Sequence, residues 1–255
     1  MKITYIHHSS FLVELESVYL LFDYTEGTIP GMKREKPLLV LASHRHGDHY
    51  SPVIFDLIKE HGNVRFVLSN DIWRKRLPEE VLPLTDSLKH GETVKYRLEN
   101  GIIRQLTRTP ENQIEDGVIS DACLTIHTYK STDEGVAFLI EAEGKTIYHA
   151  GDLNNWRWEG EPDNWNDSMA KKYSAQIDKM AGMHLDVAFL PLDPRQEDDF
   201  YLGMDEFLHK VDVKHVFPMH CWGDYSVIGK IRALGCSAGY RDRIEEITGD
   251  GEVFT

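Results

Sequence analysis

Ser43-His44-Arg45-His46-Gly47-Asp48-His49-Tyr50 is the stretch of sequence that decides the fold, because four of its eight residues carry side chains that bind metals. The apolar run Leu38–Ala42 comes directly before it and predicts a short strand. Pro52 follows it and opens a predicted helix near residues 53–60. The stretch therefore lies on a loop after a strand, where α/β proteins carry their functional residues.

The spacing of these ligand-type residues predicts two neighbouring metal ions. His44 and His46 are two positions apart and can hold one ion from the same side. Asp48 and His49 are adjacent and can turn to a second ion. Imidazole together with carboxylate suits zinc, with manganese or iron as competitors. The alternative is a histidine-rich surface loop that binds no metal, and four specified positions argue against it.

This stretch resembles the His-x-His-x-Asp-His signature of the metallo-β-lactamase superfamily. The resemblance implies an α+β fold, an αββα sandwich in which two mixed β-sheets are faced by helices, with a site for one or two metals at one edge. A chain of 255 residues is long enough for one large domain or two small ones. We expect a single metallo-β-lactamase-like domain over residues 1–255.

Later parts of the sequence match the other ligand motifs of that superfamily in order. His127 ends a predicted strand, Asp152 follows an apolar strand, and His220 ends a third predicted strand. The resemblance assigns His44, His46 and His127 to one metal and Asp48, His49 and His220 to the other, with Asp152 between the two. It also implies that two divalent ions activate a shared water. Asp48 is then the catalytic residue that orients this water and moves its proton.

Five further residues are candidates near the metals. The resemblance implies that Asp23, at the end of a predicted buried strand, orients a ligand histidine, although a carboxylate there also caps turns. His8 is a candidate pocket residue, with a solvated turn histidine as the alternative. Lys130, Arg157 and Arg195 are candidate anchors for an anionic substrate. For Arg195 the alternative is a simple ion pair with a nearby acid.

Composition limits the partners. The formal net charge of −14 argues against nucleic acid and anionic membrane surfaces. The three cysteines show no paired spacing and suggest no disulfide framework. The sequence shows no apolar signal segment and no stretch long enough to cross a bilayer. We therefore expect a cytoplasmic protein that acts on a small-molecule substrate and does not insert into a membrane. The sequence also allows a homo-oligomer.

Strands are predicted near residues 2–6, 10–15 and 18–22, and short strands of a second sheet near 93–98 and 102–106. A helix is predicted near residues 167–180. Just before it, residues 153–167 hold three of the five tryptophans in a polar stretch. This stretch predicts either a lid over the metals or a loop clamped on the domain surface.

The predicted function is that of a metal-dependent hydrolase that uses a binuclear-metal-activated water on a small anionic metabolite. Residues 131–135 and 149–152 resemble the branch of the superfamily that holds ascorbate-6-phosphate lactonase and N-acyl-phosphatidylethanolamine phospholipase D. Lactone, ester, amide and phosphodiester bonds are all open within that branch. The alternatives are a phosphodiesterase or nuclease of the same fold and a non-catalytic metal-binding protein.

Overall fold

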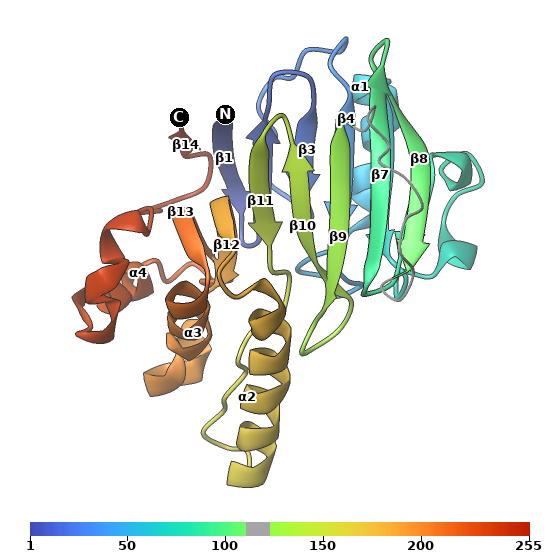
Figure 1. The fold of residues 1–255 in the computed structure, drawn as a ribbon. Coiled ribbons are helices and arrows are strands. Elements are labelled where there is room, and N and C mark those ends of the chain that lie inside the picture. Colours follow the sequence, from blue (N-terminus) through green and yellow to red (C-terminus); the bar gives the residue numbers. More distant parts are fainter. Residues whose placement is uncertain (111–122) are drawn as a thin grey trace.

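Two mixed seven-stranded β-sheets pack face to face in the computed structural model, which describes residues 1–110 and 123–255 (Figure 1). The first sheet contains, in spatial order, β14 (Val253–Phe254), β1 (Lys2–His7), β2 (Ser10–Glu14), β3 (Tyr19–Phe22), β4 (Leu38–Ala42), β5 (Val64–Ser69) and β6 (Thr85–Leu88). The second contains β13 (Asp212–Met219), β12 (His184–Pro191), β11 (Lys145–His149), β10 (Val136–Ala142), β9 (Leu124–Lys130), β7 (Glu92–Glu99) and β8 (Ile102–Pro110).

Strand direction brings the functional loops to one edge. In the first sheet β3, β4, β5 and β6 are parallel to one another, and β1 runs in the same direction because both it and β3 are antiparallel to β2. In the second sheet β11, β12 and β13 are parallel. The carboxyl ends of these strands therefore lie together at an edge of each sheet, where α/β folds place their ligand sites.

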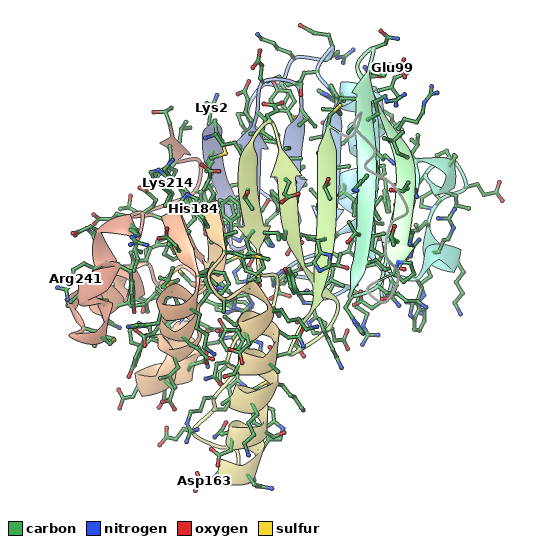
Figure 2. The ribbon with its side chains drawn as sticks, viewed as in Figure 1. Lys2, Glu99, Asp163, His184, Lys214 and Arg241 are labelled. Atoms are coloured by element: carbon green, nitrogen blue, oxygen red, sulfur yellow. The ribbon has the colours of Figure 1, made fainter. Side chains whose placement is uncertain are left out.

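The apolar strand sequences form the core between the sheets. Phe11 on β2 contacts Phe189 on β12, with ring centroids 4.2 Å apart, so the first sheet touches the second directly. Strand β4 is buried over its whole length because both faces of its sheet are covered. Charged side chains such as Glu99, Asp163 and Lys214 are exposed on the outside of the molecule (Figure 2).

Helices cover the outer face of each sheet. On the first sheet, the 3₁₀ helix Pro52–Asp56 leads into α1 (Leu57–His61), and Phe55 packs on Phe66 of β5 with ring centroids 5.3 Å apart. On the second sheet, Phe207 of α3 (Leu202–Lys210) stacks on Tyr148 of β11. Helices α2 (Asp163–Ile177) and α4 (Ser226–Ala233) lie near α3 at the same end of the molecule (Figure 1). The predicted αββα sandwich is confirmed.

Two helix boundaries differ from the sequence prediction. The predicted helix near residues 53–60 is a 3₁₀ turn in its first half, where the side chain of Ser51 caps the backbone N–H of Val53. Helix α2 begins at Asp163, four residues before the predicted start at 167. Pro162 precedes this helix and Asp163 places a negative charge in its first turn, and both favour an early start.

A carboxylate ties the two sheets together away from the site. Glu143 lies in the turn between β10 and β11, and its carboxylate accepts hydrogen bonds from the backbone N–H groups of Glu16 and Ser17, both 2.7 Å long. It also accepts one from the Ser17 hydroxyl. Burial raises the pKa of Glu143, but the hydrogen bonds from Ser17 and Glu16 outweigh it and lower the pKa below its ordinary value.

Replacement of Glu143 by glutamine is expected to lower the free energy of unfolding by about 1 kcal/mol at pH 7, because weaker neutral hydrogen bonds replace charged ones at an exposed site. A carboxylate with a lowered pKa stabilises the fold above its unfolded pKa, about 4.3, and loses this contribution as the pH falls through the folded pKa. Urea denaturation at pH 7 and at pH 3 should therefore show the difference shrinking in acid. Glu141→Gln, on the exposed face of β10, is the matched control.

Candidate metal centre

The ends of five strands supply the side chains of this centre. His8 follows β1, Asp23 follows β3, the loop with His44 follows β4, Asp152 follows β11, and His220 follows β13. Three of these residues adopt left-handed backbone conformations, with φ of 51° at His8, 42° at Asp23 and 64° at His220. Such conformations are costly for residues other than glycine and gather at functional sites.

Two groups of side chains lie close enough to hold metal ions. The first contains His8, Asp48, His49 and His220, and one ligand atom from each lies within 4.8 Å of the others. The second group meets the same criterion and contains His44, His46, Asp133 and Asp152.

Asp152 faces both groups. Its Oδ1 lies 3.1 Å from Nε2 of His49 and 3.5 Å from Nε2 of His220, in the first group. Its Oδ2 lies 3.4 Å from Nε2 of His44, in the second group. Its carboxylate therefore lies between the two groups.

Two buried carboxylates orient histidines of the first group. Asp23 accepts a hydrogen bond from Nδ1 of His49 at 2.7 Å and also binds Ser43, at the start of the motif loop. Asp193 accepts one from Nδ1 of His220 at 3.0 Å. With Nδ1 bound in this way, the Nε2 lone pair of each histidine faces the group, which is the arrangement of a metal-ligating histidine.

The electrostatics of the centre favour a cation. Burial raises the pKa of Asp133, and the charge of Asp152 raises it further. Burial would raise the pKa of Asp152 as well, but the charges of His49 and His220 hold it well below its usual range. At Asp48, burial is likewise outweighed by the imidazoles of His220 and His8, whose Nε2 atoms lie 3.4 and 3.5 Å from its Oδ2, and its pKa lies far below the ordinary value. Asp48 and Asp152 are thus held in the ionised form, and Asp133 lies close to the negative charge of Asp152. Both conditions favour the binding of a metal cation.

Buried polar atoms that lack a hydrogen bond show whether this centre could accept a metal ion. Nε2 of His8, His49 and His220 and Oδ1 of Asp152 are buried, and the described residues give none of them a hydrogen-bond partner. Buried polar atoms are normally satisfied, and leaving several unsatisfied in one place is costly. The three histidines belong to the first group and Oδ1 of Asp152 faces that group, and their donor chemistry is that of zinc, manganese or iron sites. The residues present fit a divalent metal.

The structure does not bring His127 to this centre, and its prediction as a ligand is corrected. Strand β9 continues past His127 to Lys130, so His127 lies inside the strand opposite Leu139. Its Nδ1 forms a hydrogen bond of 2.8 Å with the hydroxyl of Thr93. Asp133, in the turn after β9, lies instead beside His46, with its Oδ2 3.5 Å from Nδ1.

Sequence reasoning missed Asp133 and Asp193. A signal for Asp193 was present, because it ends a buried apolar strand segment in the same way as Asp23. Asp133 lies in the polar turn at residues 131–135, where no sequence feature distinguished it from the neighbouring acid Glu134. Bonds to the motif loop hold this turn in place: Arg45 binds Glu134 through two hydrogen bonds, and the N–H of Val136 donates to Ser43 O at 2.9 Å.

Of the three predicted substrate anchors, only Arg195 lines the cavity at this centre among the described residues. Its guanidinium is half exposed and binds Asp193. Lys130 is exposed at the end of β9. Arg157 pairs instead with Asp199 at 3.3 Å and with Asp167 at 3.7 Å.

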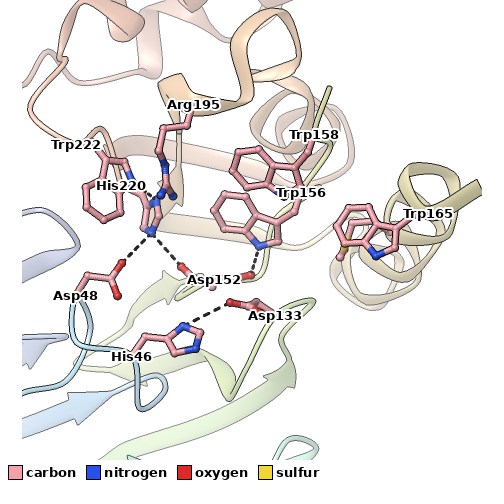
Figure 3. A pocket seen from close by; sticks show the side chains of 11 residues that line it. His46, Asp48, Asp133, Asp152, Trp156, Trp158, Trp165, Arg195, His220 and Trp222 are labelled. Atoms are coloured by element: carbon pink, nitrogen blue, oxygen red, sulfur yellow. Dashed lines mark hydrogen bonds and ion pairs between the residues drawn. The ribbon is translucent and has the colours of Figure 1, made fainter. Parts of the chain in front are cut away.

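The cavity has a volume of about 520 Å³ and opens over the charged residues (Figure 3). His46, Asp48, Asp133 and Asp152 form its floor. Trp156, Trp158 and Trp165 form one side, and Arg195 and Trp222 lie opposite (Figure 3). Met169, on the same helix as Trp165, also lines the cavity. Residues 153–167 therefore supply a wall of the cavity.

Comparisons with known proteins agree with this architecture. The model of the β-lactamase superfamily domain matches residues 2–162. The chain belongs to the β-lactamase superfamily. A UPF0173 metal-dependent hydrolase of Desulforamulus reducens is 28% identical over 230 residues, which cover 86% of this chain and 84% of that protein. Another of Thermus thermophilus is 25% identical, covering 100% of this chain and 98% of that protein.

Two solved structures share the fold. Igni18, a metallo hydrolase from Ignicoccus hospitalis, is 18% identical with a TM-score of 0.58, over 99% of this chain and 97% of that one. The metallo-β-lactamase fold protein YhfI from Bacillus subtilis is 14% identical with a TM-score of 0.55, over 100% of this chain and 99% of that one. These structures show the shared fold, and the superfamily match with the sequence relatives confirms the predicted class, a metal-dependent hydrolase of this superfamily. Within the described ranges no helix is both long and apolar enough to span a membrane.

Proposed function

We propose that the hydrolase holds two divalent metal ions, one in each group of the centre, with Asp152 as the ligand between them. The observation that carries this proposal is the convergence of buried, unpartnered Nε2 and Oδ1 atoms on one space. His44, His46 and Asp133 complete one site, and Asp48, His49 and His220 complete the other, with His8 beside Asp48 at 3.5 Å. Zinc is the expected metal, with manganese or iron as the alternatives.

Divalent ions, when bound, lower the pKa of a water that they share and stabilise negative charge that develops during hydrolysis. The protein residues contribute orientation and proton transfer. Asp48 lies at the cavity floor with its Oδ2 3.4 Å from Nε2 of His220, and its low pKa keeps it ionised at neutral pH. It is placed to orient the attacking water and to accept its proton.

The proposed substrate is a small molecule with an anionic or strongly polar reacting group. A cavity of about 520 Å³ is of the size that small ligands occupy. Arg195 provides the one arginine or lysine side chain among the described lining residues, and it lies close enough to the floor to contact such a group (Figure 3). The bond that is cleaved, whether lactone, ester or phosphodiester, is left to experiment.

The first experiment combines metal analysis with hydrolysis. Protein purified without added metal is analysed for its elements, and its hydrolysis of bis(p-nitrophenyl) phosphate and of γ-butyrolactone is measured before and after chelation. We expect about two ions per chain and a rate on one substrate that chelation abolishes and added metal restores. A folded protein that takes up no metal and cleaves neither compound would contradict the proposal.

Replacement of Asp23 by asparagine is expected to weaken metal binding by about 10–100-fold, because residues that orient metal-bound histidines contribute that much to affinity. Asparagine keeps the shape but removes the charge that accepts the hydrogen bond from Nδ1 of His49. Competition with a fluorescent chelator measures the change. Asp86→Asn is the control, because Asp86 is also buried and pairs with Arg65 instead of a histidine of the centre. Equal losses in both variants would refute the role of Asp23.

A further inference from the structure

Three tryptophans line one side of the cavity. The indole rings of Trp156 and Trp158 are parallel, with an interplanar angle of 4° and centroids 5.8 Å apart. Trp165 of α2 lies farther along the same side (Figure 3). Met169 of the same helix also lines the cavity. Trp165 keeps 37% of its surface exposed although it is a large apolar residue. Exposed aromatic surface beside a polar site is typical of ligand recognition.

This aromatic wall is held in place without a ligand. Trp156 is buried and donates a hydrogen bond of 2.9 Å from Nε1 to the backbone oxygen of Asp152. The side chain of Asn166 binds both the N–H and the C=O of Trp158, at 3.0 and 2.9 Å. The wall is therefore fixed directly to the residue between the two metal groups, and a ligand loses little free energy in ordering it.

The positions of the Arg195 charge and of the tryptophan rings determine which kind of ligand group the cavity can bind. Aromatic cages for quaternary ammonium ions surround the cation with rings, whereas Trp156 and Trp158 are stacked in parallel and do not enclose a space. The guanidinium of Arg195 lies 4.3 Å from the centre of the Trp222 ring and 5.8 Å from that of Trp158. A cation is thus already present between the aromatic side chains. A ligand cation would be repelled, whereas a neutral planar ring stacks favourably.

We propose that the wall of Trp156, Trp158, Trp165 and Met169 is a binding site for a planar aromatic group of the substrate. The ring lies against the exposed faces of Trp158 and Trp165, and the group that is hydrolysed extends to the floor at Asp48 and Asp152. This inference rests on the proposed function, since it places the reacting bond at the metal centre. It names the substrate class as aromatic esters, lactones or phosphodiesters.

Calorimetric titration of the full chain with 2-naphthoate tests this site. The same titration with decahydro-2-naphthoate, which has the same carbon skeleton but no planar ring, is the matched ligand control. We expect 2-naphthoate to bind at least about tenfold more tightly than the saturated compound, and Trp165→Ala to remove most of that difference. Trp165→Phe should retain about half of the gain in free energy, because it keeps a smaller aromatic face.

Trp73→Ala is the protein control, since Trp73 is comparably exposed but packs against Lys75 and Arg76 outside the cavity lining. Equal affinity for the two naphthoates, or tighter binding of choline than of 2-naphthoate, would overturn the inference. So would equal effects of Trp165→Ala and Trp73→Ala.

Chelation separates this inference from the proposed function. If 2-naphthoate binds through Trp165 but no chelator-sensitive hydrolysis is found, the aromatic site stands as a ligand site and the proposed function fails. If hydrolysis is chelator-sensitive but naphthyl and methyl derivatives of the cleaved bond react with equal kcat/KM in the wild type, the function stands and the aromatic site is refuted. The expected result is a naphthyl preference that Trp165→Ala abolishes and Trp73→Ala retains.

Discussion

Asp152→Asn is expected to remove most of the bound metal and to lower hydrolysis by more than about a hundredfold. Residues that only orient metal ligands already contribute about 10–100-fold to affinity, and Asp152 faces both groups through its two oxygens. Asparagine has the same size but carries no charge, and it has only one oxygen, which binds metals weakly. Elemental analysis of the purified variant and its metal-saturated rate together measure the effect.

The control for this substitution is Asp242→Asn, at an exposed aspartate of the C-terminal region. It makes the same chemical change far from the strand ends that form the centre, so metal content and rate should match the wild type. A variant with asparagine at position 152 that retained two ions and half of the wild-type rate would show that this carboxylate is not the ligand between the groups.

The metal loop was predictable because its evidence is local. The apolar strand β4, buried over its length, ends where the ligand-type residues begin, and a short sequence contains both the strand and the motif. Asp23 and His220 were also predictable from strand ends. Parallel strands of a sheet place their carboxyl ends at one edge, so residues that follow them meet in space even when they are far apart in sequence.

His127 shows where this reasoning fails. Its position at a strand end was inferred from composition, but β9 pairs with β10 as far as Lys130, so the turn that reaches the centre begins after it. Only the pairing between strands fixes where a strand ends, and a single sequence does not contain that register. The same limit hid Asp133, whose contact with His46 depends on how the turn at residues 131–135 packs on the motif loop.

The tryptophan-rich segment was ambiguous for a different reason. Its composition allowed a lid or a surface clamp, and the structure combines features of both. Trp156 is buried and bound to Asp152, whereas Trp165 lies on a helix that begins earlier than predicted and stays partly exposed at the cavity. Which indole faces solvent depends on long-range bonds such as that from Asn154 to Gln196, at 2.9 Å, which no local pattern reveals.

Gly135→Ala is expected to destabilise the protein by about 3 kcal/mol or more, the largest effect on stability that we predict. Gly135 has a φ of +71°, and a Cβ atom there would lie 2.0 Å from the backbone oxygen of Ser43 and 2.5 Å from Cβ of His44. These atoms belong to the motif loop, where Ser43 donates its N–H to Asp23 and accepts from the N–H of Val136, so relief of the clash would also displace His44.

Gly144→Ala separates this clash from backbone strain. Gly144 lies in the next turn of the same sheet with a φ of +69°, and a Cβ atom there would meet no described atom within 4 Å. Its substitution should therefore cost only the strain of a left-handed alanine, about 1 kcal/mol. Urea denaturation in the presence of a chelator measures both variants without a contribution from metal binding. If the two substitutions lower the free energy of unfolding equally, the turn at residues 131–135 does not pack closely on Ser43. The position of Asp133 beside His46 would then also be wrong.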